Sequence, residues 1–356
     1  MTYIGYLFII QTILNMVPNI LSSLLSHLTD RQRQVIIGRF ALDEKGKPLT
    51  LAAIGDKYDI TRERVRQIEA QSLANLKEQL HLHEDIEAII ESATNYLDKV
   101  GGVASIDDLD EAFKGKMGGM LPHHFAFLAS VSNAFSFYSE DNLFNRFFYT
   151  NSKSLSQVKE TIKHLTKHLQ SKKAELLHGE SSKVLEGFAR SEKLDRKFID
   201  QCINVSKLFH TNSFGDFGLA DWSEIKPTTI RERIYLVISK SQDPLHFREI
   251  AQLINKYGLS KRPALVPTVH NELIKDNRFV LVGRGIYALG EQGYVPGTAK
   301  EVITRVLTGK GALDPQEIVL AVQNERLFKP NTILANLQNK KHFERLSNGR
   351  YRVREA

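Results

Sequence analysis

LTDRQRQVIIGRFALDEKGKPLTLAAIGDKYDITRERVRQIEAQSLANLKEQL, residues 28–80, contains three segments with helical spacing separated by short breaks. Thr29 or Asp30 is predicted to cap the first helix, because short polar side chains satisfy the free amides at a helix start. One apolar stripe runs along this helix, formed by Val35, Ile36, Ile37 and Phe40. The segment DEKGKP, with its glycine and proline, predicts the end of the helix.

Two further helices are expected after this break. Thr50 is predicted to cap the short helix LAAIGDKY, which ends in a tight turn at Asp59-Ile60, and Thr61 to cap the next helix. Its inward positions are Val65, Ile68, Leu73 and Leu76. Its opposite face carries Arg62, Glu63, Arg66, Gln67 and Gln71. A helix, a tight turn and a second helix with a polar outer face predict a helix-turn-helix.

The outer face of the last helix has the chemistry that reads base pairs. Arginine pairs with guanine O6 and N7, glutamine pairs with adenine, and glutamate accepts a hydrogen bond from cytosine N4 in the major groove. Lys57 and Arg64 lie where they can hold phosphates, which positions a protein on duplex DNA without specifying its sequence. The alternative is a surface helix whose charges pair only with each other.

The same stretch resembles region 4 of the primary sigma factors of bacterial RNA polymerase. The resemblance covers about 50 residues and is most specific in TRERVRQIEA (61–70) and AAIG (52–55). It implies that the segment reads a −35-type promoter element of double-stranded DNA and docks on RNA polymerase. By motif position the base readers are Arg62, Glu63, Arg66 and Gln67, with Thr61 and Arg64 near phosphates.

Two departures from that family limit the comparison. Gln71 and Ala74 stand where the family usually carries basic residues, so an activator contact there is not expected. The aromatic side chains of the chain are not grouped into a segment of the kind that melts promoter DNA and reads a −10 element. The chain is therefore not expected to be a complete sigma factor.

Residues 226–290 predict a winged helix-turn-helix. A helix is followed by Asp243-Pro244, which is expected to open a second helix, and a third helix runs from about Pro267 to Lys275. The strands FVLV and IYAL then follow, joined by Gly283-Arg284-Gly285. Arg284 at the hairpin tip suits a phosphate or minor-groove contact.

A second copy of this pattern occupies residues 297–356. Four landmarks recur at offsets of 64 or 68 residues: Glu249-Ile250 with Glu317-Ile318, Thr268-Val269 with Thr332-Ile333, Gly285 with Gly349, and Tyr287 with Tyr351. The Asn348-Gly349 turn between alternating residues is a strong hairpin signal.

The first copy resembles the HARE-HTH winged-helix family, found in the delta subunit of some bacterial RNA polymerases, through PLHFREIA, TVHNELIKD and FVLVGRGIYAL. Such modules bind DNA or dock proteins, and both readings stay open here. The DNA candidates of the first copy are Lys261, Arg262, His270, Asn271 and Arg284. Those of the second copy are Lys329, Asn331, Lys340, Lys341 and Arg350.

The rest of the chain carries no recognisable chemistry. Residues 84–150 and 151–225 read as helical and are each interpreted as a diverged winged-helix unit. Residues 1–27 are an apolar extension or helix; they lack the basic start and the cleavage site of a signal peptide, and polar residues interrupt any membrane span. The aromatics of residues 125–149 are interpreted as core, since little positive charge accompanies them.

The distribution of charged residues favours polyanionic partners for the two ends of the chain. The chain has 48 Lys and Arg against 41 Asp and Glu, a net charge of +7. Residues 226–356 carry 22 basic and 12 acidic side chains, residues 28–80 carry 10 and 8, and residues 81–225 carry 16 and 21. Basic ends around an acidic middle fit two nucleic-acid contacts joined by a packing or partner-facing segment.

Composition also narrows the class of protein. The single Cys202 rules out an internal disulfide and a cysteine-rich zinc site, and it fits a reducing cytoplasm. No phosphate-binding glycine loop, nucleophile motif or metal-protease motif occurs. The sequence therefore predicts a mainly α, cytoplasmic, non-enzymatic transcription protein with tandem helix-turn-helix and winged-helix modules, no cofactor and no metal. A protein-docking scaffold and an architectural DNA binder are the alternatives.

Overall fold

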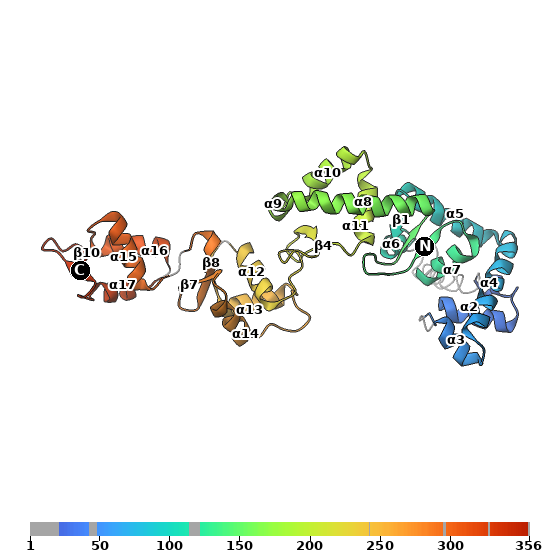
Figure 1. Cartoon of the computed structure of the whole chain (residues 1–356), viewed down its shortest axis with the longest axis horizontal. Coiled ribbons are helices and arrows are strands. Elements are labelled where there is room, and N and C mark those ends of the chain that lie inside the picture. The colour runs from blue at the N-terminus through green and yellow to red at the C-terminus, as the bar shows by residue number, and fades with distance from the viewer. Residues whose placement is uncertain are drawn as a thin grey trace, which may run out of the picture. The chain divides into compact units, whose positions relative to one another are not determined.

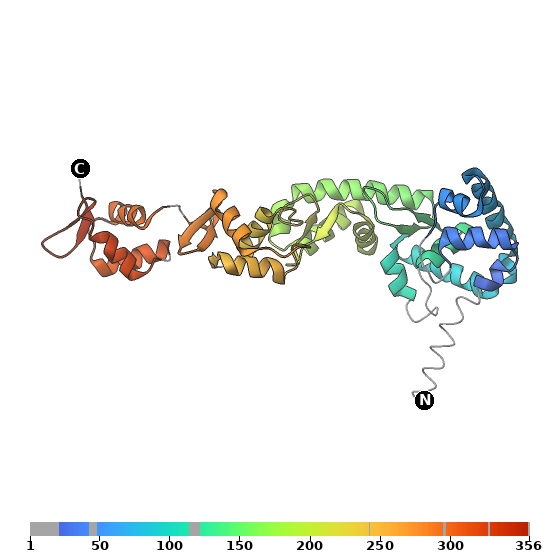
Figure 2. The same cartoon turned by 90° about the horizontal axis from the view of Figure 1, so that it is seen from below.

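The computed structural model describes residues 21–42, 48–113, 122–241, 243–294, 297–326 and 328–354. Helices dominate, and the strands form only small antiparallel sheets (Figures 1 and 2). This mainly α architecture confirms the predicted fold class. The apolar segment 1–20 and most of the DEKGKP break lie outside the described residues. The chain divides into two compact units: Met1–His210 with Phe217–Ala220, and Thr211–Asp216 with Asp221–Ala356.

In the described part of unit 1, a helical segment at residues 21–25 precedes the three helices that the sequence predicts. They are α2 (Asp30–Phe40), α3 (Leu51–Tyr58) and α4 (Arg62–Gln79), followed by the short helix η1 (Leu80–Leu82). Threonines cap all three helices: the side chains of Thr29, Thr50 and Thr61 accept hydrogen bonds from the amides of Gln32, Ala53 and Arg64. These helix starts are therefore determined by local hydrogen bonds.

Helix α4 belongs to two hydrophobic cores. Val65 and Ile68, in its first half, pack with Val35 and Ile54 in a small core shared by α2, α3 and α4. Leu76, in its second half, belongs to a larger core that includes leucines of residues 21–28 and side chains of residues 84–150. The same helix thus contributes to the small helix-turn-helix core and joins it to residues 84–150.

Residues 84–150 follow the order helix, strand, two helices, two strands. The elements are α5 (Glu84–Lys99), β1 (Val103–Ser105), α6 (Ile106–Phe113), α7 (Pro122–Ser132), β2 (Ser136–Tyr138) and β3 (Phe147–Tyr149). The strands form an antiparallel sheet of order β1-β3-β2. Most of the predicted core aromatics of this segment are buried, namely Phe125, Phe127, Phe135, Phe144, Phe147 and Phe148. They fill the interior and do not form an exposed stacking platform.

The next segment is again helical and closes with a hairpin. Its elements are α8 (Ser152–Ser171), α9 (Lys173–Leu177), α10 (Ser181–Glu192), α11 (Arg196–Val205), β4 (Phe209–Thr211) and β5 (Phe217–Leu219). Cys202 on α11 is fully buried, and burial raises the pKa of its thiol to about 12. It behaves as a small core residue, as the sequence predicts.

Unit 2 repeats the order of elements seen in residues 84–150. It starts with α12 (Ile230–Lys240), β6 (Leu245–His246), α13 (Phe247–Lys256), α14 (Val266–Lys275), β7 (Phe279–Gly283) and β8 (Ile286–Leu289), in a sheet of order β6-β8-β7, before the short helix η2 (Gly290–Gln292). The predicted helix start at Asp243-Pro244 is wrong. Strand β6 comes first because it pairs with β8, and the His246 ring then caps α13 by accepting from the amide of Arg248.

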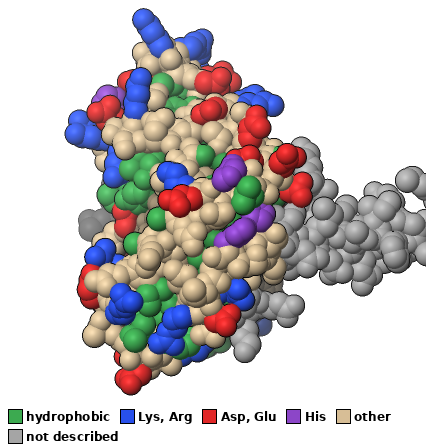
Figure 3. Space-filling view, turned by 90° about the vertical axis from the view of Figure 1, so that its right-hand side faces the viewer, with side chains coloured by type: hydrophobic (Ala, Val, Ile, Leu, Met, Phe, Trp, Pro, Cys, Tyr) green, Lys and Arg blue, Asp and Glu red, His purple; other side chains and the backbone are tan. Residues whose placement is uncertain are grey.

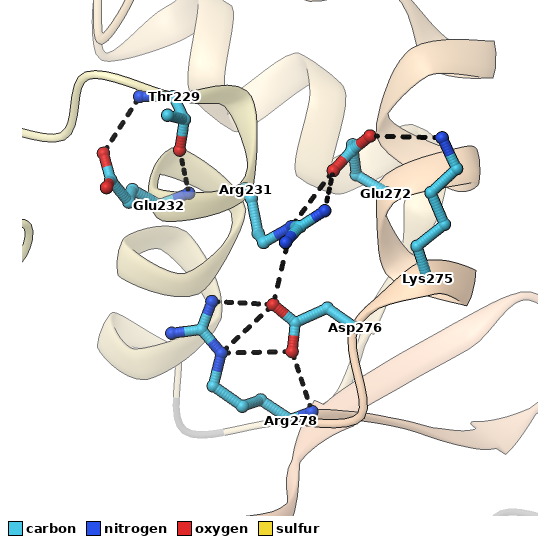
Figure 4. A network of polar contacts seen from close by, with 7 residues as sticks. All are labelled: Thr229, Arg231, Glu232, Glu272, Lys275, Asp276 and Arg278. Carbon is cyan, nitrogen blue, oxygen red and sulfur yellow. Dashed lines mark hydrogen bonds and ion pairs between the residues drawn. The ribbon is translucent and has the colours of Figure 1, made fainter.

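An ion-pair network fixes α12 to the end of α14 (Figure 4). Arg231 on α12 donates to Glu272 at 2.8 Å and lies 3.6 Å from Asp276. Asp276 also accepts from the Arg278 guanidinium at 2.7 Å and from the Arg278 amide at 3.0 Å. The Asp276 carboxylate, only 11% exposed, therefore joins α12 to the loop between α14 and β7.

The last segment carries α15 (Ala299–Lys310), α16 (Pro315–Glu325), α17 (Pro330–Leu337), β9 (Phe343–Arg345) and β10 (Tyr351–Val353). It reproduces the strand pairing of residues 226–290. Leu245 pairs with Tyr287 in one copy, and Leu313 pairs with Tyr351 in the other, at the offsets of 68 and 64 residues found in the sequence. The two copies thus share register as well as sequence landmarks.

Candidate nucleic-acid interface

The turn between α3 and α4 depends on the absence of a side chain at residue 55. The Ile60 amide donates to the Gly55 carbonyl at 3.0 Å, and Asp59 adopts a left-handed conformation with φ of 53°. A Cβ atom on Gly55 would lie 2.6 Å from the Ile60 carbonyl oxygen, closer than real contacts allow. The chain therefore leaves α3 and enters α4 along a path that is fixed by this close approach.

The first two turns of α4 present all four predicted base readers to solvent. Arg62, Glu63, Arg66 and Gln67 are exposed, while Val65 and Ile68 between them are buried. The predicted phosphate contacts Lys57, Thr61 and Arg64 are also exposed, at the end of α3 and the start of α4. The partial positive charge of a helix N-terminus therefore lies beside these side chains, which favours an anion there.

The charged side chains of this face pair with one another. Arg66 Nη2 lies 2.7 Å from Glu63 Oε1, and Arg64 Nη1 donates to Gln67 Oε1 at 3.2 Å. The hydrogen bond from Arg66 holds the pKa of the Glu63 carboxyl below its usual range. Figure 3 looks onto the end of the chain that carries α2, α3 and α4, where basic and acidic side chains are interspersed. The face therefore offers donors and acceptors side by side.

Two arginines of α2, Arg39 and Arg31, form hydrogen bonds that hold α3 and α4 in place. The sequence did not predict either role. Arg39 donates to Glu69 on α4 at 3.0 Å and to the Leu49 carbonyl at 2.7 Å. Arg31 donates to the Tyr58 carbonyl at 2.7 Å and lies over the Tyr58 ring. These contacts span about ten to thirty positions, so no local pattern signals them.

Comparison with known proteins assigns a family to this part of the chain. Residues 24–78 match the family described as Sigma-70, region 4. These residues form a sigma-70 region 4 domain. The match covers α2, α3 and almost all of α4, so the exposed face of α4 belongs to the region 4 domain.

The proteins that are similar to this chain include two RNA polymerase sigma factors, each over a short stretch. The RNA polymerase sigma-C factor of Nostoc sp. is 50% identical over 58 residues, which is 16% of this chain and 14% of that protein. The RNA polymerase sigma factor SigA4 of Synechococcus elongatus is 46% identical over 57 residues, 16% of this chain and 18% of that protein. The chain thus spans less than a fifth of the length of either relative.

The candidates of the first C-terminal copy lie at the loop after α13, on α14 and at the hairpin tip. Lys261, Arg262, Asn271 and Arg284 are exposed. His270 is half-buried, since its ring stacks on Phe247 at 4.4 Å between centroids and meets the edge of Tyr287. His270 therefore packs against aromatic neighbours in its own domain, besides being a candidate for DNA contact. The resemblance of this copy to the HARE-HTH family stays a prediction.

The candidates of the second copy surround α17 and the hairpin. Lys329, Asn331, Lys340, Lys341 and Arg350 are all exposed. Lys329 and Asn331 lie at the start of α17, and Lys340 and Lys341 lie in the loop before β9. Arg350 Nε is 3.8 Å from Asp314 Oδ2, so its charge has a carboxylate partner within the same copy.

The third helix of residues 84–150, α7, differs from α14 and α17 in its burial. Within residues 124–132 of α7 no side chain is exposed, and α7 contributes Phe125, Phe127 and Leu128 to the large core. Residues 124–132 therefore offer no exposed side chain to a DNA groove, whereas α14 and α17 carry exposed candidates. Across the described ranges no group of three or more metal-ligating side chains gathers, and no helix there has the length and apolarity to cross a membrane.

Proposed function

We propose that the chain is a DNA-binding transcription protein whose region 4 domain reads duplex DNA, at a −35-type promoter element, with the exposed face of α4. One observation carries the proposal. Arg62, Glu63, Arg66 and Gln67 are all exposed on the first two turns of a helix whose entry angle is fixed by the approach of Gly55 to Ile60. A recognition helix needs this combination of a free polar face and a rigid approach.

The side chains divide into two roles in this proposal. Arg62 and Arg66 pair with guanine, Gln67 with adenine, and Glu63 accepts from cytosine N4. Lys57, Thr61 and Arg64 hold the phosphates that flank the groove, as does the N-terminus of α4. The Thr61 oxygen already accepts from the Arg64 amide, which leaves its hydroxyl hydrogen for a phosphate oxygen.

RNA polymerase is the proposed protein partner. The two relatives named above are RNA polymerase sigma factors, and each is similar to this chain over a stretch about as long as the region 4 domain. Side chains of residues 84–150 are packed into the same core as Leu76 of α4, so this segment and the region 4 domain share one interior. We propose an accessory or regulatory role and not that of a complete sigma factor.

A protein-docking role for residues 226–290 is the second candidate. Leu265 and Ile274, at the two ends of α14, are each 64% exposed, which is unusual for large apolar side chains. The basic side chains Lys261, Arg262 and Arg284 favour DNA instead. We propose that this copy is a winged helix. Its exposed apolar side chains favour protein docking and its exposed basic side chains favour DNA binding, and an experiment has to separate these two roles.

The test is selection of bound sequences from a random duplex library with the full-length protein at about 150 mM salt, a concentration chosen because salt weakens nonspecific binding. The variant Arg62→Ala/Arg66→Ala is run beside Lys153→Ala/Lys197→Ala, which removes two exposed charges outside the region 4 domain. A motif lost only by the first variant supports the proposal, and each arginine is expected to contribute about 1–3 kcal/mol. Binding without a motif, unaffected by the first variant, contradicts base reading by α4.

A further inference from the structure

A groove with a volume of about 540 Å³ lies in unit 1, away from the region 4 domain. It runs between α8 and the segment that links β2 to β3. Tyr138 at the end of β2 lines it, together with Asp141, Leu143 and Phe144 from the link and Leu208. The lining residues from α8 are Lys159, Ile162, Lys163, Thr166 and Lys167. The volume is in the range of sites that hold a few large side chains.

The floor of this groove is apolar and partly open. Ile162 and Phe144 are buried beneath it, at 3% and 6% exposure. Leu143 is 50% exposed, although it is a large apolar side chain. An apolar side chain left in water beside a hollow is a favourable contact for an incoming apolar group.

The loop that carries Leu143 is already rigid. The Asp141 carboxylate accepts hydrogen bonds from the Tyr138 hydroxyl at 2.8 Å and from the amides of Leu143 and Phe144 at 2.8 and 2.7 Å. The Leu143 carbonyl accepts from the Lys207 amide at 2.8 Å. Because the loop is fixed before anything binds, a ligand does not have to order it.

The rim of the groove is basic. Lys159, Lys163 and Lys167 lie four residues apart on α8, which places three ammonium groups along about 12 Å of helix. All three are exposed, and none forms an ion pair with a described residue. The one carboxylate that lines the groove, Asp141, keeps its negative charge, and Lys159 is close enough to help lower its pKa. The three lysines still exceed this carboxylate, so the lining carries a net positive charge beside an apolar floor.

We propose that this groove binds an acidic amphipathic helix of a partner protein, with apolar side chains on Leu143 and carboxylates along the three lysines. A helix that carries leucines on one stripe and glutamates beside it matches both features. Nucleic-acid phosphates would use the lysines and leave the apolar floor in water. Residues 1–20 of the chain contain no acidic side chain, so they lack the complementary charge.

The test uses the full-length protein and a fluorescein-labelled peptide with leucines at helical spacing and glutamates at the other positions. A matched peptide carries lysines in place of the glutamates, and a random-sequence duplex serves as the nucleic-acid probe. The protein variants are Leu143→Ser, Lys163→Glu/Lys167→Glu and, as a charge-matched control, Lys153→Glu/Lys197→Glu. Fluorescence anisotropy gives each Kd.

The acidic peptide is expected to bind, and the matched basic peptide is not. Leu143→Ser and Lys163→Glu/Lys167→Glu are each expected to weaken binding about tenfold or more, while the control changes Kd by less than about twofold. Peptide binding that both groove variants leave intact, or no peptide binding at all, overturns the proposal. So does a loss of duplex binding in Lys163→Glu/Lys167→Glu, because the lysines would then hold phosphates. Arg62→Ala/Arg66→Ala should not affect the peptide, which separates this proposal from base reading by α4.

Discussion

Arg66 Nη2 lies 2.7 Å from Oε1 of Glu63, one turn earlier on the exposed face of α4. Arg64 and Gln67 form a second pair with the same spacing of three residues. In the free protein, therefore, three of the four proposed base readers already have hydrogen-bond partners on their own helix. Binding to DNA must exchange these pairs for base edges and phosphates, so the selectivity of the face depends on which bases replace each partner.

The first prediction concerns Glu63. Glu63→Gln releases Arg66 and removes a negative charge beside the phosphates, so affinity for all duplexes is expected to rise while preference at one base pair relaxes. Sequence selection and Kd measured against salt concentration check both effects. Glu78→Gln makes the same charge change on the exposed far end of α4. Equal effects of the two substitutions would show that only net charge matters.

The second prediction concerns the turn. Gly55→Ala is expected to lower the free energy of unfolding by about 1–3 kcal/mol and to displace α4, because its Cβ atom would press on the Ile60 carbonyl. Gly187→Ala, on α10 with no atom near the new methyl group, should stabilise by up to about 1 kcal/mol. Amide hydrogen exchange of α3, α4 and α10 measures both changes. Unchanged protection of α3 and α4 in Gly55→Ala would contradict the assigned role of the glycine.

The third prediction is a pH dependence in unit 2. Hydrogen bonds from Arg278 hold the pKa of Asp276 below its ordinary value of 3.8. A carboxyl group whose folded pKa is lowered stabilises the protein above its unfolded pKa, and this contribution is lost as pH falls through the folded pKa. Asp276→Asn is therefore expected to cost about 1–2 kcal/mol at pH 7 and much less near pH 2.

Trp222 makes this measurement specific, because it is the single tryptophan of the chain and lies in unit 2. Its fluorescence during urea denaturation at the two pH values gives the difference between wild type and Asp276→Asn. Asp243→Asn, at an exposed carboxylate of the same unit, is the control. A cost that is equal at both pH values would rule out the Asp276 carboxylate charge as the source of stability.

The fourth prediction compares the two hairpins. Gly285 and Gly349 both have positive φ, at 72° and 86°. A Cβ atom on Gly285 would lie 2.8 Å from His246 Nε2 and 2.9 Å from Phe247, whereas none would meet an atom at Gly349. Alanine at 349 is expected to cost about 1–2 kcal/mol of backbone strain, and alanine at 285 about 1–3 kcal/mol more. Hydrogen exchange of the two hairpins tests the difference, and equal losses would remove the steric explanation.

Helix starts are the part of the fold that the sequence predicts best. Thr50 and Thr61 cap the helices that they were expected to cap, and Thr29, one of two candidates with Asp30, caps the first, because each hydrogen bond joins residues three positions apart. The exposed face of α4 follows from the same periodicity. The hairpins at Gly285 and Gly349 are also predicted, since a positive φ at the turn needs glycine.

The sequence does not predict the contacts between residues that are distant along the chain. Strand β6 has only two residues, and it exists because Leu245 pairs with Tyr287, forty-two positions later. The burial of α7 against α4 likewise depends on packing between segments that no local pattern connects. In the site, Arg39 and Glu69 are thirty positions apart. Such contacts are decided by the whole core and not by spacing along the chain.

The shortness of the strands has a consequence for solubility. In the described ranges the longest strand is β7, of five residues, and a register irregularity interrupts its pairing between Leu281 and Gly283. A long, flat, unpaired edge is a template for pairing with other chains, and a bulge prevents it. One polypeptide can therefore hold several small sheets, with a half-exposed leucine on an edge strand, without inviting aggregation through its strand edges.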